Sequence, residues 1–313
     1  MNETSGSPIV SLVGIDRVGY KVALEKFDAA LCEAIAVSQA SAGRLSTPNV
    51  GYASYVLTQM CGAATSMIRA APLTRWVRSD FEDWRFGAVA GQARSLLDGY
   101  LLFKYLMEPT KSEAELKARI NVMHLNDCTR RMELHKNLGL TDDLEGFEKQ
   151  RAELQERLSG NEHFKSLPAA VQKNCMNGRF LTIATRDEML AKVEFEKGQF
   201  DALYDLWSQH VHILPLSFYR IEPNGRGTGL ENDTDRSYIA QALEICATVL
   251  TDATDIMAEQ FRDVAPVRRG VKSTFSPGPA ENRPRKAKPS RAEDPPAFQQ
   301  SSIAAAIKKS FGG

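Results

Sequence analysis

Apolar residues recur along the chain at intervals of three and four, the spacing that gathers them on one face of a helix. Between residues 17 and 40 the pattern is carried by Leu24, Phe27, Leu31 and Ile35. Between residues 236 and 264 it forms a packing seam of Ile239, Leu243, Cys246, Leu250, Ala253 and Met257. We therefore predict an all-α protein, a helical bundle in which each of these helices buries one face.

Start and stop signals divide the rest of the chain into further helices. Thr47-Pro48 is typical of a helix start, and residues 112–115 show a capping pattern. The most apolar segment, residues 80–107, ends before Glu108-Pro109 and is expected at the centre of the fold. The predicted helices span residues 17–40, 48–71, 80–107, 112–137, 142–158, 186–195, 198–213 and 236–264, with one short helix after Pro168.

Two of these predicted helices, 112–137 and 142–158, differ in how many apolar residues share one face. In the segment 112–137 we expect Leu116, Ile120, Met123 and Leu134 to point inward. The segment 142–158 has only a narrow apolar stripe and carries Glu/Lys and Glu/Arg pairs four residues apart. It is predicted to form a projecting, charged helical arm.

Composition defines three regions. Residues 1–15 are rich in Ser and Gly and are predicted to be a flexible N-terminus. Residues 16–264 are predicted to form one helical domain, interrupted at 221–235 by a Gly/Asn/Asp-rich loop that is either a lid or a disordered connection. Residues 265–313 contain many prolines among Lys and Arg, so we predict a disordered basic tail with a short helix at 302–309.

The charge distribution bears on partners. The chain has zero net charge, but residues 264–313 hold ten Lys and Arg against three acids, so this part carries about +7 and the remainder about −7. A mildly acidic body argues against a broad nucleic-acid-binding face on the folded part. The tail itself remains a candidate for contacts with nucleic acid or a partner protein.

Cysteine content and hydropathy indicate the cellular compartment of the protein. Five widely spaced cysteines indicate buried thiols in a reducing compartment rather than disulfides or a zinc cluster. The N-terminus lacks the features of a signal peptide, and no segment reaches 18 uninterrupted apolar residues. We predict a soluble, cytoplasmic protein with no membrane contact.

Two polar constellations interrupt the apolar faces. Arg94 and Asp98 lie one turn apart in the most apolar predicted helix, and burying either charge alone would cost several kcal/mol. They therefore pair with each other or reach a shared third group. The pair is either a structural ion pair of the core or an anion clamp held rigid by its carboxylate.

The second constellation lies in the helix predicted at 198–213. Tyr204, Ser208 and His212 are spaced four residues apart, so the three side chains share a face. They would either hydrogen-bond to neighbouring helices or bind a polar ligand, with His212 moving a proton. His210 points elsewhere, because two residues on a helix diverge by about 200°, and the two imidazoles are a poor metal pair. No metal site or cofactor is predicted.

An Arg separated from a following His by four to six residues is used by many helical ribonucleases of toxin and defence systems. The chain contains three such pairs: Arg119/His124, Arg130/His135 and Arg157/His163. With 5 His in 313 residues, roughly one match is expected by chance, so the pattern carries little information.

Together, the two constellations resemble an uncharacterised, mainly bacterial family known as domain of unknown function 5677, which is similar to the helical HEPN superfamily. The family pattern has an Arg and an acid four residues apart, here Arg94 and Asp98, with Asp where Glu is usual. An aromatic-x-x-Leu-Ser-x-x-Val-His-x-x-Pro block follows, with Trp207 at the Leu position and the other positions filled by Tyr204, Ser208, Val211, His212 and Pro215.

The resemblance covers about residues 50–260 and implies a HEPN-like bundle in which the helix of Arg94 lies against that of His212. One polar pocket would then contain Arg94, Asp98, Tyr204, Ser208 and His212. The resemblance implies no activity.

Two functions stay open on the sequence. One is a metal-independent ribonuclease or nucleotide-acting protein of a toxin or defence type, with His212 as general base and RNA or a nucleotide as partner. The other is a non-catalytic binding or scaffold module whose polar cluster is structural and whose tail recruits a partner. The sequence does not decide whether the protein is an enzyme, and a homodimer is compatible with both.

Overall fold

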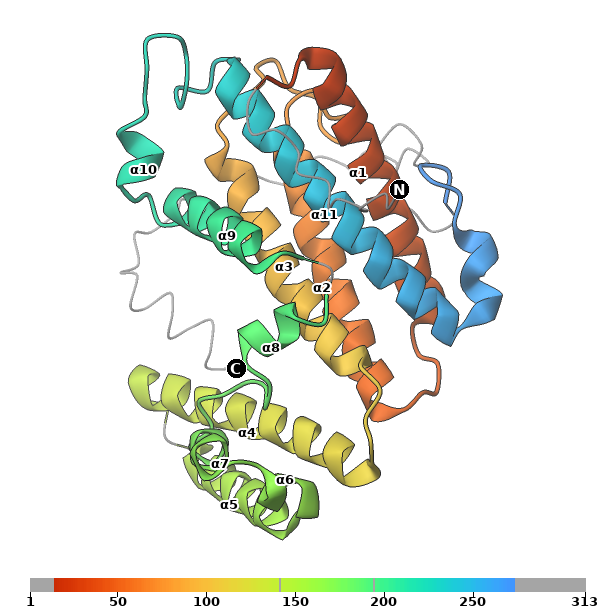
Figure 1. Cartoon of the computed structure of the whole chain (residues 1–313), viewed down its shortest axis with the longest axis vertical. Helices are drawn as coiled ribbons and strands as arrows, with labels where there is room; N and C mark the ends of the chain where they lie inside the picture. Colours follow the sequence, from red (N-terminus) through yellow and green to blue (C-terminus); the bar gives the residue numbers. More distant parts are fainter. Residues whose placement is uncertain (1–13, 141, 194, 274–313) are drawn as a thin grey trace, which may run out of the picture. The chain divides into compact units, whose positions relative to one another are not determined.

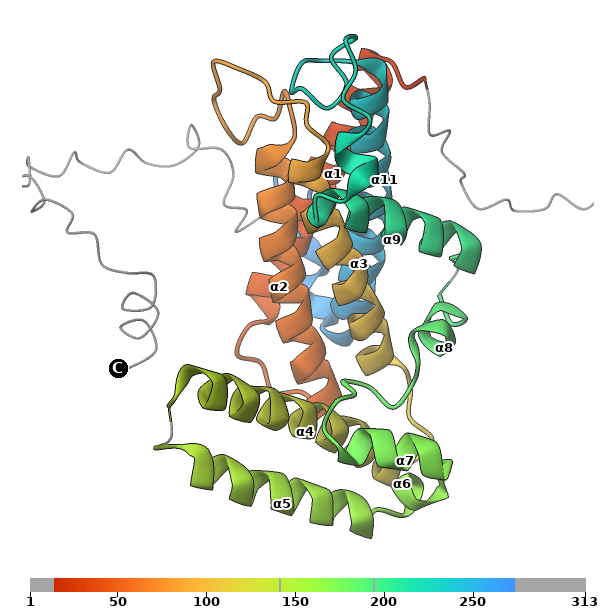
Figure 2. The same cartoon turned by 90° about the vertical axis from the view of Figure 1, so that its left-hand side faces the viewer.

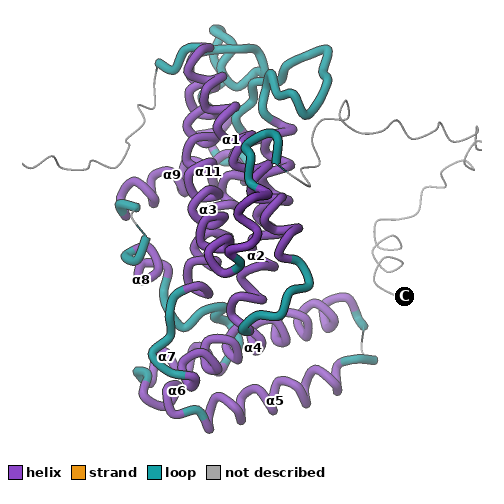
Figure 3. Tube along the Cα trace, turned by 90° about the vertical axis from the view of Figure 1, so that its right-hand side faces the viewer, coloured by secondary structure: helices purple, strands orange, loops and turns teal. Residues whose placement is uncertain are grey.

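The computed structural model describes residues 14–140, 142–193 and 195–273 of the chain. Helices joined by loops make up these residues, and among them we find no strand, only an isolated bridge between Arg269 and Val271 (Figure 3). The prediction of an all-α fold is confirmed. Most of the predicted N-terminal segment 1–15 and tail 265–313 lies outside the described residues, as does the short helix predicted at 302–309.

The described chain forms two compact units where the sequence predicts one helical domain over residues 16–264. The first, which we call the bundle unit, comprises residues 14–109 and 184–273, and the second, the α4–α7 unit, comprises residues 110–183. Each has its own apolar core. The hydrophobic pattern alone does not reveal this division, because both units are built from helices of the same kind.

Four long helices lie side by side in the bundle unit (Figure 2): α1 (Arg17–Ser41), α2 (Pro48–Ala70), α3 (Gly87–Met107) and α11 (Asp233–Gln260). α1 packs on α11, α2 packs on α3, and α3 also packs on α11. The predicted seam of α11 is confirmed, because all six of its members are fully buried. The predicted inward face of α1 is buried as well.

The bundle unit also contains three shorter helices, two of which pack on α3. α8 (Arg186–Leu190) and α9 (Lys197–Val211) both contact α3, and α10 (Pro215–Phe218) follows α9 (Figure 1). Phe200 and Trp207 are 1% and 0% exposed and fix α9 on the bundle through apolar burial. The polar face of α9 is therefore held next to α3.

The segment before α3 is a loop where the sequence predicts a helix from residue 80. Arg75 and Trp76 donate hydrogen bonds to the buried carboxylate of Asp28, and the Tyr20 hydroxyl donates to Pro72 O. Trp84 N donates to Gly229 O. These bonds give the backbone a non-helical path, which is why α3 begins only at Gly87.

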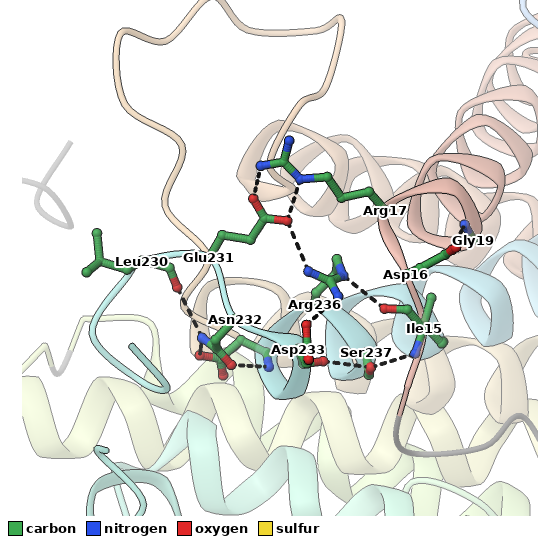
Figure 4. Close-up of polar contacts among 11 residues, drawn as sticks. Ile15, Asp16, Arg17, Gly19, Leu230, Glu231, Asn232, Asp233, Arg236 and Ser237 are labelled. Carbon is green, nitrogen blue, oxygen red and sulfur yellow. Dashed lines mark hydrogen bonds and ion pairs between the residues drawn. The ribbon is translucent and has the colours of Figure 1, made fainter. Parts of the chain in front are cut away.

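The Gly-rich loop before α11 is fastened in its middle and at its C-terminal end. Asn232 caps α11 by accepting from Asp235 N, and the Asp235 carboxylate accepts from Gly227 N. Glu231 binds both Arg17 and Arg236, and Arg236 also donates to Ile15 O (Figure 4). The cap starts α11 at Asp233, three residues earlier than predicted.

The folded chain continues beyond Val264, where the sequence predicts the tail to begin. The 3-10 helix η1 (Arg262–Val267) follows α11, and Arg268 pairs with Glu33 and Asp255. Arg268 is therefore part of the bundle unit, and its basic side chain has a structural role.

The α4–α7 unit comprises α4 (Glu113–Leu138), α5 (Leu144–Gly160), α6 (Glu162–Ser166) and α7 (Ala169–Met176). α5 is not an isolated arm, because Leu154 and Leu158 are buried against α4 while its charged pairs stay exposed. The predicted inward face of α4 is wrong. Its buried apolar residues are Ala118, Val122, Leu125, Cys128 and Met132, and Leu134 is 46% exposed.

All five cysteines are buried free thiols, which confirms that part of the prediction. Burial raises the pKa of the Cys61 thiol to about 12 and that of Cys175 to about 11. Within the described residues, no helix combines the length and the apolar character needed to span a bilayer.

Candidate functional site

The packing of α9 on α3 brings the predicted polar residues together. Arg94 lies in the middle of α3, half-buried, and its guanidinium contacts two residues of the α9 segment. Nη1 is 3.0 Å from Nε2 of His212, and Nη2 donates to the Tyr204 hydroxyl at 3.0 Å. Residues more than a hundred positions apart in the sequence thus meet through one guanidinium.

Tyr204 is the centre of the cluster. The Arg94 guanidinium carbon lies 4.6 Å from the centroid of the Tyr204 ring, and that of Arg186 lies 4.9 Å from it. The ring also stacks on buried Phe200, with centroids 5.6 Å apart. Cations over an aromatic face are stabilised by the negative potential of that face, so the Tyr204 ring is a common neighbour of both guanidinium groups.

Arg186 is the functional candidate that the sequence does not reveal. It lies in the first turn of α8, exposed to solvent, and donates to Asp201 at 3.1 Å. In the sequence its surroundings indicate only a helix start, since Thr185 and Glu188 form a capping box. No sequence signal connects Arg186 with Tyr204, because the two lie on different helices, α8 and α9, whose packing is not set by local spacing.

Asp98 joins the cluster through the phenol. The Tyr204 hydroxyl donates to Asp98 Oδ2 at 3.3 Å, so Arg94 and Asp98 share a third group, one of the two arrangements expected from their spacing. Loss of solvation by the surrounding protein raises the pKa of Asp98, and this effect outweighs the opposing influence of Arg94, Tyr204 and Arg186.

His212 is placed by the end of its helix. It is the C-cap of α9, with its N–H donating to Ser208 O, and its side chain is exposed. Because Arg94 is only a donor, Nε2 of His212 must be the acceptor, which places the imidazole proton on Nδ1. The next residue, Ile213, has a φ of 53°, which is unfavourable for a β-branched residue and turns the chain away from the helix axis.

His210 points elsewhere, as the spacing predicts. Its ring packs edge-to-face with that of Phe86, with centroids 4.9 Å apart, whereas the ring of His212 contacts Arg94. Burial lowers the pKa of His210. The two imidazoles therefore have different neighbours and do not converge.

Ser208 lies on the same face as Tyr204, but its hydroxyl donates to the backbone oxygen of Tyr204. This bond is the local one that Ser makes inside helices. In this arrangement Ser208 does not contribute its hydroxyl to the guanidinium cluster, and the contacts above are carried by Arg94, Asp98, Tyr204, His212 and Arg186.

The cluster lies outside two cavities of the described structure. One cavity of about 410 Å³ is lined by α3, α8 and α11, including Leu101, Met189 and Ile256. The other, of about 530 Å³, is a groove between α2 and α3 that includes Tyr55 and Gly99. Neither cavity is lined by a residue of the cluster.

Among the described residues, no three His, Cys, Asp or Glu side chains are placed to hold a metal ion together. Comparisons of the chain with family models, curated proteins and solved structures found no significant match. The resemblance to the family of unknown function and to HEPN proteins stays a prediction. Chemically, the cluster offers two guanidinium groups for an oxyanion and one imidazole nitrogen that can accept a proton.

Proposed function

We propose that the chain is a metal-independent ribonuclease that binds an RNA phosphate at Arg94 and Arg186 and uses His212 as its general base. The observation that carries the proposal is the position of the Arg94 guanidinium, which touches both His212 Nε2 and the Tyr204 hydroxyl on an exposed surface. Guanidinium groups match the geometry of phosphate oxygens and remain charged at all physiological pH values.

Each residue has a role that follows from its contacts. Arg94 and Arg186 bind the non-bridging phosphate oxygens and stabilise the charge that develops there. Asp98 and Tyr204 hold Arg94 in place. The bond between Arg94 and Nε2 occupies the base in the free protein, and a phosphate that takes over the donors of Arg94 releases Nε2.

The released nitrogen can then take the proton of the ribose 2′-hydroxyl. The 2′-oxygen attacks phosphorus, the bond to the 5′-oxygen breaks, and that oxygen takes a proton from water. The products are a 2′,3′-cyclic phosphate and a free 5′-hydroxyl. General-base help of this kind contributes on the order of 100- to 10,000-fold in rate.

A His212→Gln variant tests the proposal, because Gln can still accept a hydrogen bond from Arg94 but cannot take up a proton. We expect cleavage of a labelled single-stranded RNA, measured with a chelator present, to fall roughly 100- to 10,000-fold. His163→Gln in the α4–α7 unit is the matched control and should cleave like the wild type. Equal cleavage by wild type and folded His212→Gln would contradict the role of His212.

The alternative is a non-catalytic binding or scaffold module. It is favoured by the way Arg94 and Tyr204 fasten α9 to α3. Under this alternative the purified wild type would not cleave RNA, and Arg94→Ala would destabilise the fold strongly. The basic tail, a candidate contact for nucleic acid or a partner protein, would then account for recruitment.

A further inference from the structure

The chain that follows His212 is unusually apolar for an exposed segment. Between Val211 and Ile221 most apolar side chains are more than a third exposed, and Ile213 and Tyr219 reach 74% and 75%. α10 lies next to the end of α9, which is its main neighbour (Figure 1). Contiguous exposed apolar surface of this kind usually marks a binding site.

Two aromatic rings form the centre of this segment. Phe218 is 41% exposed and Tyr219 is 75% exposed, and their centroids lie 4.7 Å apart at 81°. An edge-to-face pair fixes both rings against each other, while the exposure of Tyr219 keeps at least one of its faces open to solvent. An open aromatic face is a surface on which a nucleobase stacks.

The charges of the segment suit a polyanion. Between Asp205 and Glu222 the sequence contains no acid, and it contains His210, His212 and Arg220. Arg220 is exposed directly beside Tyr219. A phosphodiester backbone can therefore approach the rings without meeting a like charge in this segment.

The rings are also close to the proposed catalytic site. Tyr219 is seven residues from His212, so the two cannot be more than about 25 Å apart even along an extended chain. The path is shorter, because Leu214 N donates to Gln209 O and Tyr219 N donates to Pro215 O. The ring pair is thus held beside the end of α9 at a distance that a short oligonucleotide spans.

We propose that Phe218 and Tyr219 form a stacking platform for an unpaired base of single-stranded RNA, adjacent to the phosphate bound at Arg94. The inference rests on the proposed function and adds the substrate class, single-stranded rather than duplex RNA. In a duplex the base faces are stacked on one another and are not available to a protein ring.

Binding is measured by fluorescence anisotropy of the full-length chain with a short single-stranded RNA that is 2′-O-methylated, so that it cannot be cleaved. Tyr219→Ala should weaken binding by roughly 5- to 150-fold, the equivalent of one lost base stack. Tyr219→Trp should retain wild-type affinity or exceed it. Tyr55→Ala is the matched control, since Tyr55 is 69% exposed and also forms an edge-to-face pair, with Tyr52.

The outcomes separate the platform from the proposed function. Unchanged affinity of Tyr219→Ala, with cleavage still dependent on His212, would overturn the platform and leave the ribonuclease proposal standing. Equal affinity for the single strand and its duplex would also overturn the platform. A change of oligomeric state in Tyr219→Ala with no change in RNA affinity would identify the surface as a self-association site instead. A wild type that neither binds nor cleaves RNA would refute both proposals.

Discussion

Two clusters of Arg, Asp and an aromatic side chain in the bundle unit differ in what surrounds the carboxylate. In the first, Asp28 is 6% exposed and accepts hydrogen bonds from Arg75 and Trp76. In the second, Asp98 is exposed and accepts from Tyr204 alone among the bonds described above. The same residue types thus form a closed pair in one place and an open chain of contacts in the other.

The surroundings of the two carboxylates distinguish a structural ion pair from a candidate binding site. Both oxygens of Asp28 are occupied, and the cluster ties the loop before α3 to α1, so nothing is left to receive a ligand. In the open cluster Arg94 donates to a neutral imidazole and a phenol, both of which a phosphate oxygen can replace. A charge that is already paired inside the fold leaves no group for a ligand, and removing its partner destabilises the protein, whereas exchangeable contacts are compatible with binding.

The largest expected effect belongs to the closed cluster. Asp28→Asn keeps the shape of the side chain but removes the charged acceptor of Arg75 and Trp76, and because only the carboxylate is buried while the Arg75 side chain is 35% exposed, the cost is about 2 kcal/mol. The free energy of unfolding is measured by urea titration followed by circular dichroism.

Asp263→Asn is the matched control, since Asp263 also binds one arginine, Arg44, but its side chain is 68% exposed where that of Asp28 is 8% exposed. Exposed pairs contribute little, so this variant should unfold close to the wild-type midpoint. If both variants lose the same stability, burial is not what makes the Asp28 pair structural, and the contrast between the two clusters disappears.

Arg94→Ala should have a smaller effect on folding, about 1 kcal/mol, because Tyr204 keeps its hydrogen bond to Asp98 and water can reach the vacated positions. The same urea titration measures it. A loss as large as that of Asp28→Asn would show that Arg94 is a packing element of the same kind as Arg75. That result would favour the scaffold alternative over the ribonuclease.

Much of the fold and part of the candidate site could be predicted from local spacing. The seam of α11 and the face of α1 are unambiguous, because one stripe of large apolar residues dominates each helix. Spacing also placed Arg94 with Asp98 and Tyr204 with His212 on common faces. The meeting of the two helices was expected from a family resemblance and not from spacing.

The remaining features depend on contacts between distant residues. α4 carries two competing apolar stripes, and the packing of α5 selects Val122, Leu125 and Met132 rather than the stripe of Leu116 and Ile120. Asp28 meets Arg75 and Arg186 meets Tyr204 only after the chain has folded back on itself. Local patterns contain no information on such pairs, which explains why Arg186 and the closed cluster were missed.

The smallest change in the free energy of unfolding is expected from Asp98→Asn. The sign of this change distinguishes the cluster of Asp98 from that of Asp28. Desolvation raises the pKa of Asp98 in the folded protein above its ordinary value of 3.8, so the folded state binds the proton more tightly than the unfolded state. The stabilising contribution of protonated Asp98 is fully present below pH 3.8 and is lost as the pH rises through the folded-state pKa.

At neutral pH, Asp98→Asn should therefore be slightly more stable than the wild type, and the difference should shrink as the pH is lowered toward 3.8. Urea midpoints of both proteins across this pH range measure the trend. A variant that is less stable than the wild type at neutral pH would mean that the attraction of Arg94 and Arg186 exceeds the cost of desolvation. Asp98 would then be a structural partner of the same kind as Asp28, and the cluster around Tyr204 would lose the openness on which phosphate binding depends.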